Sequence, residues 1–132
     1  METSKQEKIN EINSNYNQNY KINKSGRIYR IFMNKKMWFK FDELVQRWEN
    51  FDRERNADKN AKVVCEFITK KGGDLTYTSI HGSFYFNFKG LKIRVSNHDW
   101  TSENHLSPDV NLCSYSENGH KEMISKFENI VA

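Results

Sequence analysis

Two stretches of the sequence bring together side chains that can bind ligands or transfer protons. The first is the polar loop from Asn97 to Pro108, which contains His98, Asp99, Glu103 and His105. Imidazole and carboxylate groups on one loop can hold a divalent cation or act as acid and base. Their spacing matches no established metal-binding motif. A small metal-assisted hydrolase or nuclease that uses His98, Asp99 and His105 is therefore an alternative hypothesis, beside simple hydrogen bonding within the loop.

The second stretch is a basic and aromatic run from Lys21 to Phe41. It contains seven Lys or Arg residues and no Asp or Glu, and its aromatic side chains are interleaved with the cations. A surface that binds nucleic acid needs cations for the phosphates and rings on which bases can stack. The alternative is a pair of core strands whose cations are merely solvated. With two cations from a later strand, the residues expected to contact a nucleic acid or a protein effector are Arg27, Tyr29, Arg30, Lys35, Lys36, Trp38, Lys40, Lys92 and Arg94.

Other functional motifs are missing from the sequence. Gly72 and Gly73 lie in a turn rather than at the start of a helix, so they do not form a phosphate-binding loop. No Ser has a His and an orienting acid at a predictable distance, as a hydrolase triad would need. We therefore expect no catalytic residues, no resident metal and no cofactor, and we expect that the protein is not an enzyme.

The elements that would position these residues are read from hydrophobic periodicity. The best-defined element is a β-hairpin from Ser83 to Asp99, because apolar residues alternate on both sides of a Lys89-Gly90 turn. An N-cap at Asp42 begins an amphipathic helix that runs to about Arg55. The other expected elements are a helix or arm over residues 3–20, strands over 27–33, 37–41, 62–69, 75–80 and 110–115, and a C-terminal helix after Gly119 that contains Ile124.

These elements predict an α+β fold in a single domain of residues 1–132. The expected architecture is an antiparallel β-sheet of five to seven strands with two to three helices packed on one face. Residues 1–24 would form an N-terminal helix or a flexible arm, and residues 25–132 the α+β core. The stripe of Ile9, Ile12, Tyr16 and Tyr20 gives a further alternative, a protein-interaction module or a homodimer.

The cellular setting is inferred from composition. No apolar run approaches the length of a membrane span, and the N-terminus lacks the apolar segment of a signal peptide. We expect a cytoplasmic protein of a bacterial host cell that has no membrane partner. In that reducing compartment, Cys65 and Cys113 are expected to be small buried hydrophobic side chains rather than a disulfide.

The segment Lys89 to His98, with the sequence KGLKIRVSNH, resembles a strand ending found in small uncharacterised proteins of phages and plasmids. In those proteins a Gly turn is followed by Ile-Arg-Val/Ile-Ser-Asp-His, and Asn97 stands here where Asp is usual. The resemblance covers about one eighth of the chain and carries no established activity. It implies a small cytosolic protein of a mobile element, similar in size and character to anti-CRISPR and other anti-defence proteins.

The leading hypothesis combines the basic and aromatic run with this resemblance. The protein is expected to bind a nucleic acid or a nucleoprotein immune effector and to inhibit it by occupying a site. The strand pair after Gly26 would supply most of the contacts. Basic charge also attracts acidic protein surfaces, so the sequence leaves DNA, RNA and protein open as partners.

Overall fold

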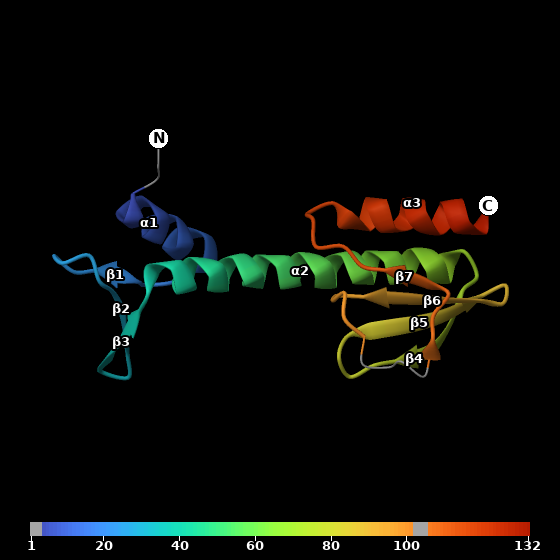
Figure 1. The fold of residues 1–132 in the computed structure, drawn as a ribbon, viewed down its shortest axis with the longest axis horizontal. Helices are drawn as coiled ribbons and strands as arrows, with labels where there is room; N and C mark the ends of the chain where they lie inside the picture. Colours follow the sequence, from blue (N-terminus) through green and yellow to red (C-terminus); the bar gives the residue numbers. More distant parts are fainter. Residues whose placement is uncertain (1–3, 102–105) are drawn as a thin grey trace. The chain divides into compact units, whose positions relative to one another are not determined.

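The structure is a computed structural model that describes residues 4–101 and 106–132. These residues form an α+β fold with three helices and two sheets, one of three strands and one of four (Figure 1). The chain divides into two compact units, Met1–Phe51 and Asp52–Ala132. The boundary lies inside the second helix, and each unit is described below by itself.

The first unit contains one helix, a three-stranded sheet and the beginning of the second helix. Its elements are α1 (Lys5–Tyr16), β1 (Lys21–Ile22), β2 (Ile28–Phe32), β3 (Lys35–Phe39) and the first residues of α2 (Phe41–Lys70). The side chain of Ser4 caps α1 by accepting a hydrogen bond from the backbone N–H of Glu7 at 3.1 Å. The helix ends at Asn17, whose φ of 54° is left-handed.

The β2–β3 hairpin has a shorter connection than the sequence suggested. The expected connection was Asn34-Lys35-Lys36, but Phe32 pairs directly with Lys35 and the turn is Met33-Asn34. Both turn residues have positive φ, 51° and 64°. Two left-handed residues are the signature of a type I′ turn, whose twist matches that of the flanking strands. The turn fixes the register, and the register decides which side chains share a face.

The core of the first unit is small and rich in rings. Ile9, Ile12, Tyr20, Ile28 and Leu44 are buried, and further aromatic side chains pack against them. The stripe that we considered as an interface to another chain is therefore largely enclosed within its own unit.

The second unit contains the rest of α2, a four-stranded sheet and a C-terminal helix. Its other elements are β4 (Asp74–Thr78), β5 (Ser83–Phe88), β6 (Leu91–Ser96), β7 (Val110–Leu112) and α3 (Gly119–Val131). The predicted hairpin is confirmed: β5 and β6 are antiparallel, and Phe88 pairs with Leu91 across the Lys89-Gly90 turn. The strand order is β4-β5-β6-β7, with β6 and β7 parallel to each other.

Two predictions about the architecture were wrong. Residues 62–69, expected as a strand, belong to α2. Ala57, Ala61, Val64 and Ile68 are buried at spacings of four, three and four, which is the period of a helix. With this segment helical, the expected single sheet of five to seven antiparallel strands is replaced by two smaller sheets, one of which has a parallel strand pair.

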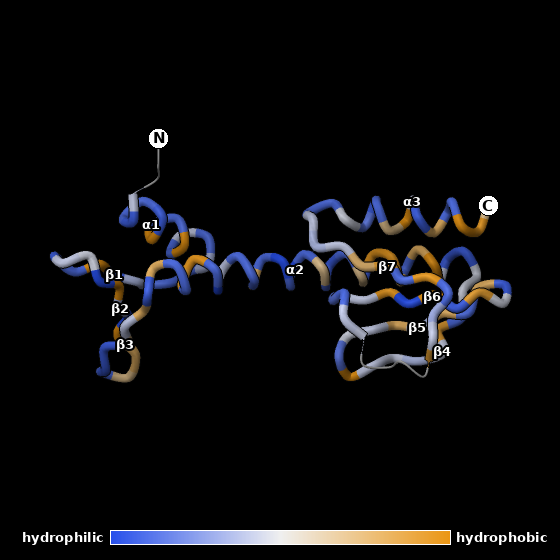
Figure 2. Tube along the Cα trace, viewed as in Figure 1, coloured by the Kyte–Doolittle hydropathy of each residue, from blue (hydrophilic) through white to orange (hydrophobic). Residues whose placement is uncertain are grey.

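The core of the second unit joins α2, the sheet and α3. It contains Val64 and Ile68 from α2, Ile93 and Val95 from β6, and Phe127 from α3, with other apolar residues around them. Figure 2 shows hydrophobic residues recurring along α3 with hydrophilic residues between them, as expected for a helix with one buried side.

A buried amide fixes the segment that leads into α3. The side chain of Asn60 is fully buried, and its Nδ2 donates to the backbone carbonyls of Ser114 at 3.1 Å and Ser116 at 2.8 Å. Gly119 follows at the start of the helix, and a Cβ there would collide with Ser114 and with the Asn60 side chain of α2. Close packing between α2 and this segment therefore requires glycine at position 119.

We predict that the Cys65 thiol reacts slowly in the folded protein. Both cysteines are free thiols, and burial, with a smaller effect of Glu66, raises the pKa of Cys65 from 9.0 to about 12. Only the thiolate reacts, so alkylation by iodoacetamide at pH 8 should be slower than in the urea-unfolded chain by about tenfold or more. Mass spectrometry of the alkylated peptides measures the two rates. Equal rates would contradict the prediction.

The raised pKa of Cys65 also makes the stability of the fold depend on pH. The pKa of Cys65 is higher in the folded state than in the unfolded state, so the folded state binds this proton more tightly. Its contribution to stability is complete below pH 9 and is lost as the pH rises towards 12.

None of the helices in the described parts of the chain is long and apolar enough to cross a membrane.

Candidate functional site

The three-stranded sheet of the first unit carries alternating cations and rings on one of its faces. Lys21, Tyr29 and Trp38 are cross-strand neighbours in β1, β2 and β3 and therefore point to the same side. Lys36 belongs to this side by strand alternation, and Arg27 reaches it just before β2. We call this the outer face and define it by Lys21, Arg27, Tyr29, Lys36 and Trp38.

Two of the cations of the outer face, Arg27 and Lys36, lie over its rings. The guanidinium carbon of Arg27 is 4.1 Å from the centre of the Trp38 ring, and the Lys36 Nζ is 4.9 Å from that of Tyr29. The rings of Tyr29 and Trp38 are 5.4 Å apart. Cation–π contacts at exposed sites are worth about 0.5–1 kcal/mol each. They restrain the two charges while leaving N–H groups free to donate to an anion.

The remaining predicted contacts of this unit lie elsewhere. Arg30 and Lys35 point to the opposite face of the hairpin. Arg30 is half-buried, donates to Gln18 Oε1 at 3.1 Å and lies over the ring of Tyr20. Its Nε is buried without a hydrogen-bond partner among the described residues. Lys40 is exposed and follows β3.

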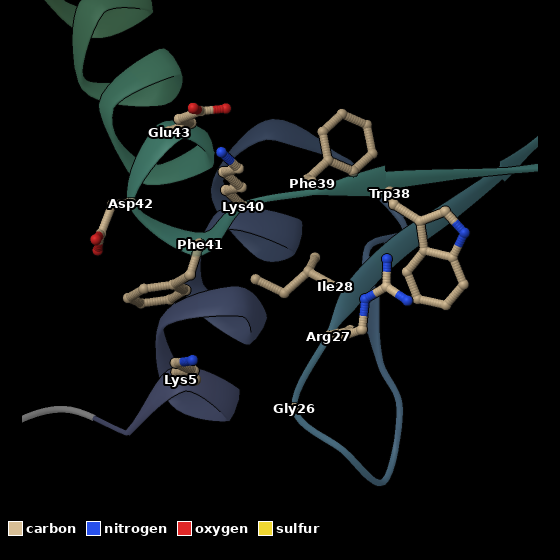
Figure 3. Close-up of a pocket in the computed structure, with 10 residues that line it drawn as sticks. All are labelled: Lys5, Gly26, Arg27, Ile28, Trp38, Phe39, Lys40, Phe41, Asp42 and Glu43. Carbon is tan, nitrogen blue, oxygen red and sulfur yellow. The ribbon is translucent and has the colours of Figure 1, made fainter.

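A hollow of about 770 Å³ adjoins the outer face at Arg27 and Trp38 (Figure 3). Figure 3 shows the Arg27 guanidinium beside the Trp38 indole. The charged groups that line the hollow are Lys5, Arg27, Lys40, Asp42 and Glu43. Three cations face two carboxylates, so the hollow is nearly balanced in charge. The outer face is the better place for a polyanion because it carries no carboxylate of its own.

The second unit holds the two other predicted contacts, Lys92 and Arg94. Lys92 is exposed, but Arg94 is only 1% exposed. The Arg94 guanidinium donates to the backbone carbonyl of Trp100 at 2.6 Å, to Ser96 Oγ at 3.2 Å and to Asn111 Oδ1 at 3.3 Å. A guanidinium enclosed in this way acts inside the unit and does not present a surface charge.

Sequence reasoning missed the cluster of polar side chains around Arg94. Ser83 and Ser96 face each other at the ends of β5 and β6, with their hydroxyls 3.1 Å apart. His98 is 7% exposed, its Nδ1 lies 3.1 Å from Ser96 Oγ, and its ring stacks on Trp100 at 3.9 Å. The hairpin register would have placed the two serines together. The burial of the cluster depends on the segment after β6, which no local pattern reveals.

This cluster is not arranged for nucleophilic catalysis. Ser83 Oγ is 3.5 Å from His98 Nε2, but the side chains of both serines are fully buried. A substrate therefore cannot reach either hydroxyl without a rearrangement of the unit. The arrangement suits a structural role in which Arg94, Ser96 and His98 hold the chain together where β6 ends.

The structure describes two of the four residues that could form the metal site expected in the loop after β6. His105 and Glu103 lie outside the described residues. His98 is buried beside Trp100, whereas Asp99 is exposed and its backbone N–H donates to the Tyr115 hydroxyl at 3.0 Å. Among residues 4–101 and 106–132, no three His, Cys, Asp or Glu side chains come together in a way that would hold a metal ion.

The geometry defines an α+β protein with an exposed basic and aromatic hairpin in one unit and a buried polar cluster in the other. Comparisons of the chain with family models, with curated proteins and with solved structures find no match.

Proposed function

We propose that this protein binds nucleic acid, free or within a nucleoprotein effector, through the outer face, and that it inhibits by occupying that site. The observation that carries the proposal is the pairing of Arg27 with Trp38 and of Lys36 with Tyr29 on an exposed sheet face. Cations neutralise phosphates, and rings next to them can stack on unpaired bases.

The charge pattern supports a polyanionic partner. No acidic residue occurs between Lys21 and Phe41, so no carboxylate of that segment offsets the cations of the outer face. With Lys21, Arg27 and Lys36 each contacting one phosphate, the logarithm of the affinity should fall with the logarithm of the salt concentration with a slope of about −3. A slope of that size indicates binding that is strong at low salt and weak at high salt.

The resemblance to phage and plasmid proteins concerns the other unit. Arg94, Ser96 and His98, which belong to the shared strand ending, are the residues of the buried cluster. We infer that this sequence pattern encodes how the end of β6 is held, and that the outer face is a separate feature of this chain. The anti-defence role is proposed by analogy of size and character with such proteins.

A matched pair of charge reversals tests the binding surface. The double variant R27E/K36E removes two outer-face cations, and K59E/K121E makes the same change in net charge at exposed residues of the second unit. Fluorescence anisotropy with labelled single-stranded and duplex DNA and RNA measures binding at low salt. We expect R27E/K36E to weaken binding by about tenfold or more and to reduce the salt slope by about 2.

The control should bind within about twofold of the original chain, because Lys59 and Lys121 belong to the other unit and are not part of the outer face. Circular dichroism should be unchanged in both variants. Equal binding by R27E/K36E and the original chain, or equal weakening by both variants, would remove the outer face as the site. Absence of binding to every nucleic acid would remove the proposal itself.

A further inference from the structure

The end of the β2–β3 hairpin carries a group of exposed apolar side chains. Their exposed fractions are 54% for Ile31, 57% for Phe32, 80% for Met33 and 41% for Met37. Single exposed apolar residues are common, but four on one hairpin end are not explained by the packing of the unit. We call them the apolar tip. Lys35 and Lys36 lie within the same hairpin end, so the tip is bordered by positive charge.

The turn itself favours a role for one of these side chains. Met33 occupies the first central position of a type I′ turn with φ 51°. This position prefers Asn, Asp or Gly because the left-handed conformation crowds a larger side chain. A methionine there is less favourable for folding than Asn would be. Met33 is the most exposed of the four residues of the tip, so its side chain can contact a partner.

We propose that the partner of the apolar tip is duplex DNA, and that Phe32 and Met33 insert between neighbouring base pairs and kink the duplex. This inference rests on the proposed function, because the outer face would hold the phosphates alongside. Two-stranded β-ribbons bind DNA in its major or its minor groove. Phe and Met are among the apolar side chains that wedge between base steps in bent protein–DNA complexes.

The position of the cations favours DNA over a lipid bilayer as the occupant. Arg27 and the turn at Met33 are six residues apart, which corresponds to about 20 Å along a strand. The Arg27 guanidinium carbon and the Lys36 Nζ both lie near the centre of the Trp38 ring, at 4.1 Å and 5.8 Å, so these charges are grouped on the side of the hairpin behind its tip. Phosphates that flank an inserted wedge would meet this group, whereas a hairpin that dips its end into a bilayer would meet headgroups with the tip alone.

A variant whose residues suit the turn can remove the wedge while keeping the hairpin folded. In F32T/M33N, Thr suits a strand and Asn suits the left-handed turn position, so the hairpin should be retained while the tip loses its apolar character. The probe is a duplex of about 30 base pairs with a fluorescent donor and acceptor at its two ends. We expect the original chain to raise energy transfer through a kink of about 20–90°. The variant keeps the outer face, so it should still bind the duplex with a salt-dependent affinity, but it should leave the duplex nearly straight.

The outcomes distinguish this inference from the proposed function. Duplex binding with unchanged energy transfer would overturn the wedge and leave nucleic-acid binding in place. Equal bending by the original chain and F32T/M33N would also overturn it. Absence of any nucleic-acid binding would overturn both. Vesicles of phosphatidylcholine with phosphatidylserine serve as the comparison, and tip-dependent binding to them without DNA bending would assign the tip to a membrane surface and overturn the inference.

Discussion

Replacing Arg94 with Met is expected to lower the free energy of unfolding of the second unit by about 3 kcal/mol or more. The guanidinium donates to the carbonyl of Trp100 and to the side chains of Ser96 and Asn111. Methionine fills similar space but donates nothing, so three hydrogen bonds from a charged donor are lost, and bonds to charged groups are worth about 1.5–3 kcal/mol each. Ser96 is buried, whereas Trp100 and Asn111 are exposed residues and lose less, because water can replace the donor. Part of this loss is offset because a buried cation no longer has to be desolvated.

Two further variants make the Arg94 prediction specific. Arg94→Lys keeps the charge but not the planar fork that reaches several acceptors, so we expect it to be destabilising as well. Lys92→Met changes an exposed cation on the same strand and should alter stability by no more than about 0.5 kcal/mol. Urea unfolding measures all three, with an unchanged m-value as the sign that the midpoint reports stability. A midpoint for Arg94→Met equal to that of Lys92→Met would show that the buried bonds add no net stability.

In the second unit, the sequence predicts the β5–β6 hairpin but not the burial of Arg94. The β5–β6 hairpin was predictable because alternation and a Lys-Gly turn agree with each other. The same alternation placed Arg94 on the side facing away from the apolar core and suggested a surface cation. Its burial follows from the carbonyls of His98 and Trp100, which come from the segment after β6. Alternation describes the strand alone and does not reveal that the segment after the strand encloses Arg94.

The error over residues 62–69 has a different cause. Val63, Cys65 and Phe67 alternate as in a strand, while Ala61, Val64 and Ile68 follow the spacing of a helix. Both periods are present, so the pattern alone does not decide. No Gly or Pro interrupts the chain between Phe41 and Lys70, and α2 continues without a break. The passage from one compact unit to the other inside this helix therefore has no linker signature in the sequence.

The candidate site was predictable in residue type but not in arrangement. The acid-free run from Lys21 to Phe41 identified the basic and aromatic residues. Which of them share a face depends on the two-residue turn at Met33-Asn34, which the sequence did not show clearly because Met is unusual there. The register places Lys21 on the same face of the sheet as Tyr29 and Trp38. It places Arg30 and Lys35 on the opposite face.

The second large effect is expected from Trp48→Ala, which should unfold most of the first unit. The Trp48 ring stacks on Tyr16 with centres 4.6 Å apart, contacts Phe51 at 5.4 Å, and its Nε1 donates to the Tyr20 hydroxyl at 3.3 Å. Truncating a fully buried Trp to Ala costs about 3–5 kcal/mol, and because Trp48 is partly buried against this core, we expect a loss towards the lower end of that range. A unit of about 50 residues buries little apolar surface and has a small margin of stability. Hydrogen exchange followed by mass spectrometry should therefore show lost protection between Lys5 and Phe39.

Trp38→Ala is the matched control, because it removes the same side chain from the outer face instead of the core. Trp38 is 42% exposed, and its ring supports Arg27 rather than the packing of α1. We expect this variant to keep its protection from exchange and to bind nucleic acid about tenfold more weakly, since a stacking ring is worth about 1–3 kcal/mol. Trp48→Ala should lose protection and binding together, because the outer face depends on the folded sheet. Protection in Trp48→Ala equal to that of the original chain would show that the ring cluster does not hold the first unit together, and the outer face would then need another source of rigidity.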